Sequence, residues 1–89
     1  MDFNNVIERR IVSRGDHRLV LEMSANEYKQ DYDELNDDYA MNILQSYLQF
    51  RGDDGRVEDA KIEYDPNYDI VRIYAKVNYL DNDHTGYFF

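Results

Sequence analysis

The chain has 89 residues with 19 Asp or Glu against 10 Lys or Arg, which gives a formal net charge of −9 at pH 7. This length indicates a single domain, residues 1–89, with a small core. The absence of cysteine excludes disulfides and thiolate metal sites, and the acidic charge argues against nucleic acid or an anionic membrane as a direct partner. The N-terminal residues do not resemble a signal peptide, and no stretch approaches the roughly 20 apolar residues of a membrane span. We therefore expect a cytoplasmic protein.

Two aliphatic segments, residues 6–12 and 17–23, flank a turn-forming stretch at residues 13–16. In the second segment Leu19, Leu21 and Met23 alternate with polar residues, which is the pattern of a half-buried strand. The first segment is less regular, because Arg9 lies between two isoleucines. The two segments together predict an N-terminal β-hairpin.

A helix is predicted to follow at residues 25–50. Ser24 and Glu27 have the spacing of a capping box, and apolar residues recur every three or four positions through Phe50. One continuous helix would be about 39 Å long, whereas a domain of this size is only about 30 Å across. We predict one long or kinked helix. Two helices, the second capped by Asn36 or Asp37, are the alternative.

A second hairpin is predicted near the C-terminus. Residues 57–64 and 68–80 flank a turn at Asp65-Pro66-Asn67. Val71, Ile73 and Ala75 share one face of the longer strand, with basic residues between them. The order strand, strand, helix, strand, strand predicts an α+β fold, in which a four-stranded antiparallel sheet packs against the helix.

The strongest functional signal is a run of acidic residues in the predicted helix. Residues 22–38 contain seven carboxylates and one cation, Lys29. Such a face either keeps the protein soluble or docks on a basic partner, and carboxylates on successive helical turns could imitate a line of phosphates. We predict that the partner-binding residues are Glu27, Asp31, Asp33, Glu34, Asp37 and Asp38.

Other motifs are weaker. Arg-Gly-Asp occurs at residues 14–16 and 51–53, where glycine in a turn is sufficient explanation. Residues 81–86 resemble the first half of an EF-hand loop but lack the acid at position 12. The aromatic stretch at 87–89 either folds back on the sheet or anchors a partner. A second acidic set between residues 53 and 69 reflects either the solvation of loops and a hairpin or a further binding surface.

These features predict a small acidic protein-binding module, a stoichiometric inhibitor or regulator that docks on the basic, nucleic-acid-binding surface of a partner protein. In size and charge the chain resembles small phage- or plasmid-encoded inhibitors such as anti-CRISPR proteins, DNA mimics and nuclease immunity proteins. That resemblance is one of composition and no motif carries it. We expect no enzymatic activity, cofactor or metal. The alternatives are a homo-oligomeric assembly protein, such as a homodimer formed through sheet edges and the aromatic tail, and a small carboxylate-based enzyme.

Overall fold

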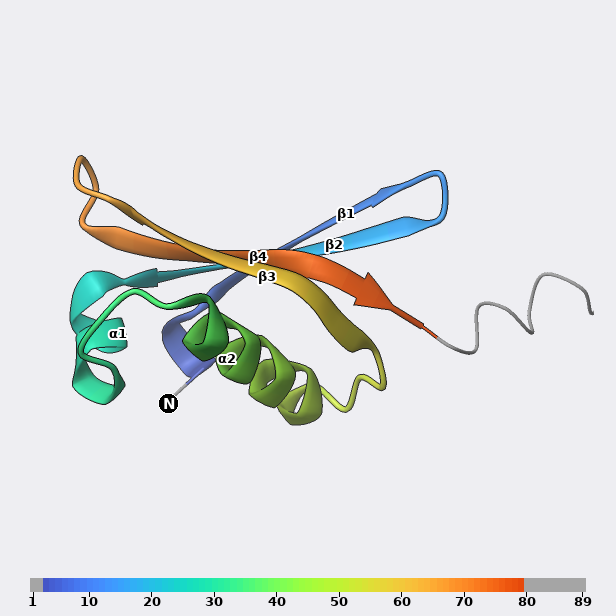
Figure 1. Ribbon diagram of the computed structural model, residues 1–89, viewed down its shortest axis with the longest axis horizontal. Coiled ribbons are helices and arrows are strands. Elements are labelled where there is room, and N and C mark those ends of the chain that lie inside the picture. The colour runs from blue at the N-terminus through green and yellow to red at the C-terminus, as the bar shows by residue number, and fades with distance from the viewer. Residues whose placement is uncertain (1–2, 80–89) are drawn as a thin grey trace, which may run out of the picture.

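A computed structural model of the chain describes residues 3–79. It is an α+β fold in which one four-stranded antiparallel sheet, in the order β1-β2-β4-β3, carries two helices (Figure 1). The elements in chain order are a short 3₁₀ helix η1 (Phe3–Asn5), β1 (Ile7–Ser13), β2 (Asp16–Ser24), α1 (Ala25–Asp31), α2 (Asp37–Phe50), β3 (Arg56–Asp65) and β4 (Ile70–Asn78).

The N-terminal hairpin is confirmed. β1 and β2 pair antiparallel, with Ser13 opposite Asp16, so the turn has only two central residues. Arg14 and Gly15 both have positive φ, 54° and 84°. Positive φ at both central positions is the geometry of a type I′ turn, whose twist matches that of the flanking strands.

The C-terminal hairpin is also confirmed, with one irregularity. The register between β3 and β4 shifts between Glu58 and Lys61, where Asp59 has a φ of 55°. An extra residue in one strand reverses the alternation of its side chains. Val57 and Ala60 are three positions apart, yet both are buried in the core. The predicted alternation in β4 holds throughout, since Val71, Ile73, Ala75 and Val77 are all buried.

The one long or kinked helix predicted for residues 25–50 is divided into two helices. α1 ends at Asp31, and α2 begins at Asp37 after a five-residue connection. The side chain of Asn36 caps α2 by accepting a hydrogen bond from the Asp38 N–H at 2.7 Å. Asn36 and the two aspartates after it are poor residues for a helix interior but good ones for a helix start. The alternative of two helices, with Asn36 as the cap, is therefore the correct one.

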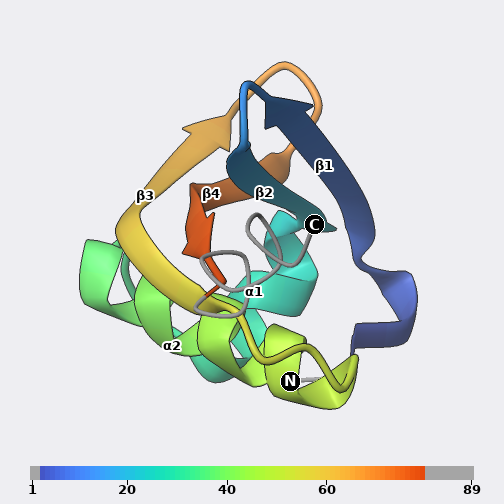
Figure 2. The same ribbon diagram turned by 90° about the vertical axis from the view of Figure 1, so that its right-hand side faces the viewer.

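Both helices lie on the same side of the sheet, and the core fills the space between the two layers (Figure 2). None of the helices within residues 3–79 is long and apolar enough to cross a membrane. The core consists of alternate side chains from the strands together with one side of each helix: Leu19, Leu21, Met23, Ala25, Tyr28, Ala40, Ile43, Leu44, Tyr47, Leu48, Val57, Ala60, Val71, Ile73, Ala75 and Val77.

Candidate functional site

The six predicted partner-binding carboxylates do not share one helical face. They are divided between two helices and the connection that joins them, so the spacing that would align them along a single helix has no structural counterpart. Glu22, the first acid of the run, is buried in the sheet, where it pairs with Arg9 and Arg72 at 3.0 and 2.8 Å. Glu27 lies in the first turn of α1, Asp31 ends that helix, Asp33 and Glu34 lie in the connection, and Asp37 and Asp38 form the first turn of α2.

The break in the helix changes the electrostatics of these residues. Glu27, Asp37 and Asp38 each lie in the first turn of a helix. There the positive end of the helix dipole favours a negative charge, typically by about 0.3–1 kcal/mol. In one continuous helix, Asp37 and Asp38 would have been interior and without this benefit. Three of the six carboxylates therefore have a local structural role as well as any role in binding.

Five of the six carboxylates remain close together in the chain, in a segment of eight residues. We call residues 31–38 the acidic connection. Tyr28 holds it in place from α1, because its hydroxyl donates a hydrogen bond to the backbone carbonyl of Glu34. Burial raises the pKa of Tyr28 to about 12, so the hydroxyl keeps its proton at neutral pH. The ring of Tyr32 stacks on that of Tyr28 and packs at a tilt against that of Tyr39, with centroid separations of 5.2 and 4.8 Å.

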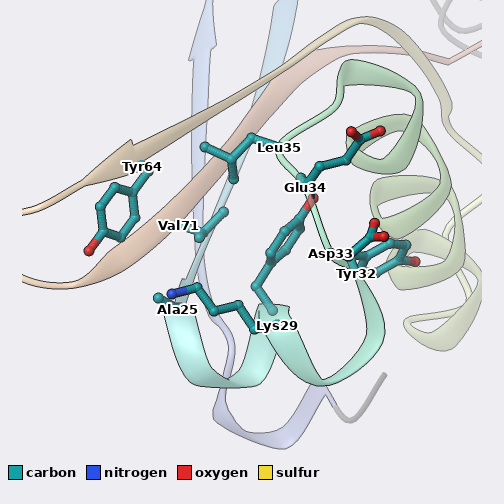
Figure 3. A pocket seen from close by; sticks show the side chains of 9 residues that line it. Ala25, Lys29, Tyr32, Asp33, Glu34, Leu35, Tyr64 and Val71 are labelled. Atoms are coloured by element: carbon teal, nitrogen blue, oxygen red, sulfur yellow. Dashed lines mark hydrogen bonds between the residues drawn. The ribbon is translucent and has the colours of Figure 1, made fainter.

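A shallow depression of about 210 Å³ borders the acidic connection (Figure 3). Leu35, Val71 and Tyr64 lie on one side of it, and the carboxylates of Asp33 and Glu34 on its border point away from these three side chains. Leu35 is 50% exposed and Tyr64 is 41% exposed. Apolar and aromatic side chains beside charged ones form the usual pattern of a protein contact surface, with an apolar centre and a polar rim.

Charge is distributed unevenly between the two layers. Residues 25–50 contain six carboxylates and one cation, Lys29. From the sheet, Lys61 approaches Asp37 with 3.7 Å between Nζ and Oδ2, and both side chains are more than half exposed. An exposed pair of this kind contributes little to stability. The helical layer therefore presents a surface of strongly negative charge.

Sequence analysis missed a second polar cluster, which lies at the end of the sheet where β4 finishes. Asp53 accepts hydrogen bonds from Arg10 at 2.8 Å and from Tyr79 at 2.9 Å, and Arg10 also contacts the Tyr79 hydroxyl. These residues come from β1, from the loop after α2 and from the position after β4. Nothing in their sequence spacing indicates that they meet. The cluster ties three distant segments together, which is a structural role.

The stability of the domain is expected to fall in acid because of Asp53. Burial by itself would raise the pKa of Asp53. Hydrogen bonds from the Gly55 N–H, Tyr79 and Arg10 outweigh burial and hold this pKa below its ordinary value of 3.8. At pH values between the pKa of Asp53 in the folded chain and its higher pKa in the unfolded chain, the carboxylate binds a proton in the unfolded chain only. The free energy of unfolding therefore decreases as the pH falls through this range.

Urea unfolding followed between pH 7 and about pH 2.5 measures this effect. Asp53→Asn should make the free energy of unfolding less dependent on pH below about pH 4. Asp54→Asn is the matched control, because Asp54 is exposed and makes no hydrogen bond or ion pair within residues 3–79. If both variants kept the full acid dependence of the parent chain, the assignment to Asp53 would be wrong.

Within the described residues, no group of three or more His, Cys, Asp or Glu side chains could hold a metal ion. His17 is partly buried and packs edge-on against the ring of Tyr79, with centroids 4.9 Å apart. The EF-hand-like stretch at 81–86 and the aromatic stretch at 87–89 lie outside the described residues, so both interpretations stay predictions.

Comparison with protein-family models, with curated proteins and with solved structures finds no match for this chain. Its fold and charge distribution are therefore the basis on which a function can be inferred.

Proposed function

We propose that this chain is a protein-binding module whose acidic connection docks on a basic surface of a partner protein. The observation that carries the proposal is the concentration of charge, five carboxylates within the eight residues 31–38, on a segment that Tyr28 fastens to the core. A segment fixed before binding loses less conformational entropy when it binds. The neighbouring exposed Leu35 supplies an apolar contact beside the charges.

The geometry favours a compact basic patch over an extended groove as the partner surface. The carboxylates come from the end of one helix, a short connection and the start of the next helix, so they do not follow the line of a single helix. Imitation of a regular row of phosphates would need the single helix that does not form. Clustered charges still raise the rate of association with a basic surface, and salt weakens that attraction.

The partner we propose is a nucleic-acid-handling protein, which the chain would inhibit or regulate by occupying its basic surface. Such proteins bind phosphate groups through clusters of lysine and arginine. An acidic protein of this size can cover one such cluster as a one-to-one complex. The proposed function thus needs no catalytic group and no cofactor on this chain.

Charge reversal tests the proposal. The variant Asp33→Lys, Glu34→Lys changes two exposed side chains of the acidic connection. The variant Asp16→Lys, Asp54→Lys changes the net charge equally at exposed sites elsewhere. Tagged parent chain, variant and control are used to capture proteins from the native cell lysate at low salt and at about 0.5 M salt, where screening is strong, and the captured proteins are identified by mass spectrometry.

We expect the parent chain and the control variant to capture a basic protein at low salt. The variant with the reversed acidic connection should not capture it, and neither should the parent chain at high salt. Purified partner should then bind the reversed variant at least about a hundredfold more weakly, since loss of some 3 kcal/mol corresponds to that factor. Capture that is unchanged by reversal of the acidic connection would refute the proposal.

A homo-oligomeric assembly protein is the second candidate, and the edge strand β1 favours it. Ile7, Ile11 and Val12 are 59%, 54% and 60% exposed on this strand. Exposed aliphatic residues on an edge strand are a common route to self-association. Sedimentation velocity over a range of concentrations distinguishes the two candidates: a chain that stays monomeric at every concentration is incompatible with assembly.

A further inference from the structure

The side chains of β1 point in unexpected directions. The register places Ile7, Arg9 and Ile11 opposite Glu22, Val20 and Arg18 of β2, on the face of the sheet that the helices do not cover. We call this the open face. The alternate residues Glu8 and Arg10 turn to the helical side, where Glu8 accepts a hydrogen bond from Tyr47 and Arg10 binds Asp53. The alternation in β1 therefore leaves aliphatic side chains on the open face.

A shallow depression of about 520 Å³ lies on the open face. In the sheet register, Val20 of β2 lies opposite Tyr74 of β4, and Tyr74 lies opposite Lys61 of β3. Tyr74 is 38% exposed. The depression is lined by Ile11, Val20 and Tyr74, by three cations, Arg18, Lys61 and Lys76, and by Asp59 and Ala75.

Arg18 and Lys76 are directly opposite one another on the two central strands. Like charges at such positions repel each other and destabilise a sheet. Within residues 3–79 neither side chain forms an ion pair, whereas on the same face Arg72 binds Glu22 at 2.8 Å and Asp65 at 3.0 Å. A chain with a net charge of −9 thus keeps two cations side by side at the centre of a sheet, although Glu58 of β3 is the cross-strand neighbour of Lys76 without forming an ion pair with it. An anionic group bound between them would remove the repulsion.

We propose that the open face binds a short acidic segment of a partner protein, with carboxylates at Arg18 and Lys76 and an apolar side chain on Val20 and Tyr74. Charge complementarity selects an anionic occupant, and the apolar centre selects one with apolar side chains. A nucleic-acid strand fits less well. Glu58 lies opposite Lys76 and Asp59 lines the depression, so a continuous row of phosphates would meet carboxylates as soon as it left the central strands. This site lies on the other side of the sheet from the acidic connection, and Lys61 borders both, since it lines the depression and pairs with Asp37 at 3.7 Å.

The test is a titration of ¹⁵N-labelled chain followed by NMR. The probe is a synthetic blocked peptide with the sequence Glu-Phe-Glu-Leu-Glu, and its matched control replaces each Glu by Gln. Two further titrations complete the test. One uses an oligothymidylate of similar charge, and the other uses the labelled chain alone at increasing concentration. Together these titrations separate an acidic peptide, a nucleic acid and a second copy of the chain as occupants.

We expect the acidic peptide to shift the amide signals of residues 18–20 and 74–76, and the Gln peptide to bind at least about tenfold more weakly, a loss of roughly 1.4 kcal/mol. Arg18→Glu with Lys76→Glu should weaken binding of the acidic peptide similarly. Arg14→Glu with Lys29→Glu, which changes two exposed cations outside the depression, should not. If Arg18→Glu with Lys76→Glu prevents folding, the comparison of the acidic peptide with the Gln peptide on the parent chain still tests the proposal.

Equal shifts from both peptides, or none at millimolar peptide, would overturn the proposal. So would tighter binding of the oligothymidylate, which would assign the face to nucleic acid. Concentration-dependent shifts of these residues in the chain alone, with no response to peptide, would assign it to a second copy. The variant with a reversed acidic connection should bind the acidic peptide as the parent chain does. If the open face does not bind the peptide, the proposed function of the acidic connection still stands. If the acidic connection binds no partner, the proposal for the open face still stands.

Discussion

Gly55→Ala is expected to destabilise the domain by about 2 kcal/mol, the middle of the range for overpacking a well-packed core. A Cβ atom at this position would lie 2.3 Å from Cγ1 of Val77, 2.9 Å from Cε1 of Tyr79 and 3.0 Å from Oδ1 of Asp53. Val77 is buried in the core and branched at Cβ, so it has little freedom to move away. Gly55 therefore permits the loop after α2 to pass close over the end of β4.

Urea unfolding of the variant measures the loss, and Gly52→Ala is the control. Gly52 has a φ of +68° with no atom near its would-be Cβ, so alanine there costs backbone strain of about 1 kcal/mol without a clash. Adding Val77→Ala to each variant separates the two causes. It should recover part of the loss in the Gly55 variant and none in the Gly52 variant. Independent, additive effects of the Gly55 and Val77 substitutions would show that the close approach is not the cause.

The paired strands could be predicted from sequence because apolar and polar residues alternate along them, and this alternation indicates which face of the strand is buried. Leu19, Leu21 and Met23 in β2 and the valines of β4 lie where period-2 alternation puts them. β1 shows the limit of that argument. It contains isoleucines at Ile7 and Ile11, but their shared face is the open one, because tertiary partners draw the alternate charged residues to the helical side. Hydrophobic pattern alone does not identify which face of an edge strand is covered.

The helix break and the candidate site were predictable only in part. The apolar period continues in register from α1 into α2, so periodicity favoured one helix. The deciding contacts are the cap made by Asn36 and the hydrogen bond from Tyr28 to the carbonyl of Glu34. The cap could be expected from the sequence, because Asn36 is a residue that favours the start of a helix, and the two-helix alternative rested on it. The tyrosine contact has no sequence signal, because it depends on a loop conformation that exists only after the helix has ended. The acidic run could therefore be read from the sequence, but its division between two helices and a connection could not.

Leu44→Ala is expected to cause the largest loss of stability, about 3 kcal/mol, within the usual range for a buried leucine. Leu44 is 0% exposed and lies at the middle of α2, the helix that packs on β3 and β4. At roughly 0.05–0.15 kcal/mol per residue, a domain of this size has about 4–13 kcal/mol of total stability. The substitution would remove a large part of it.

Urea unfolding again gives the magnitude, with Leu44→Met and Ser46→Ala as controls. Methionine nearly conserves volume and should cost less than about 1.5 kcal/mol. Ser46 is exposed on the same helix, so alanine there should be neutral or slightly stabilising. A loss at Leu44 no greater than at Ser46 would mean that α2 does not pack on the sheet as described. That result would also remove the support of the acidic connection, because its last two carboxylates form the first turn of α2.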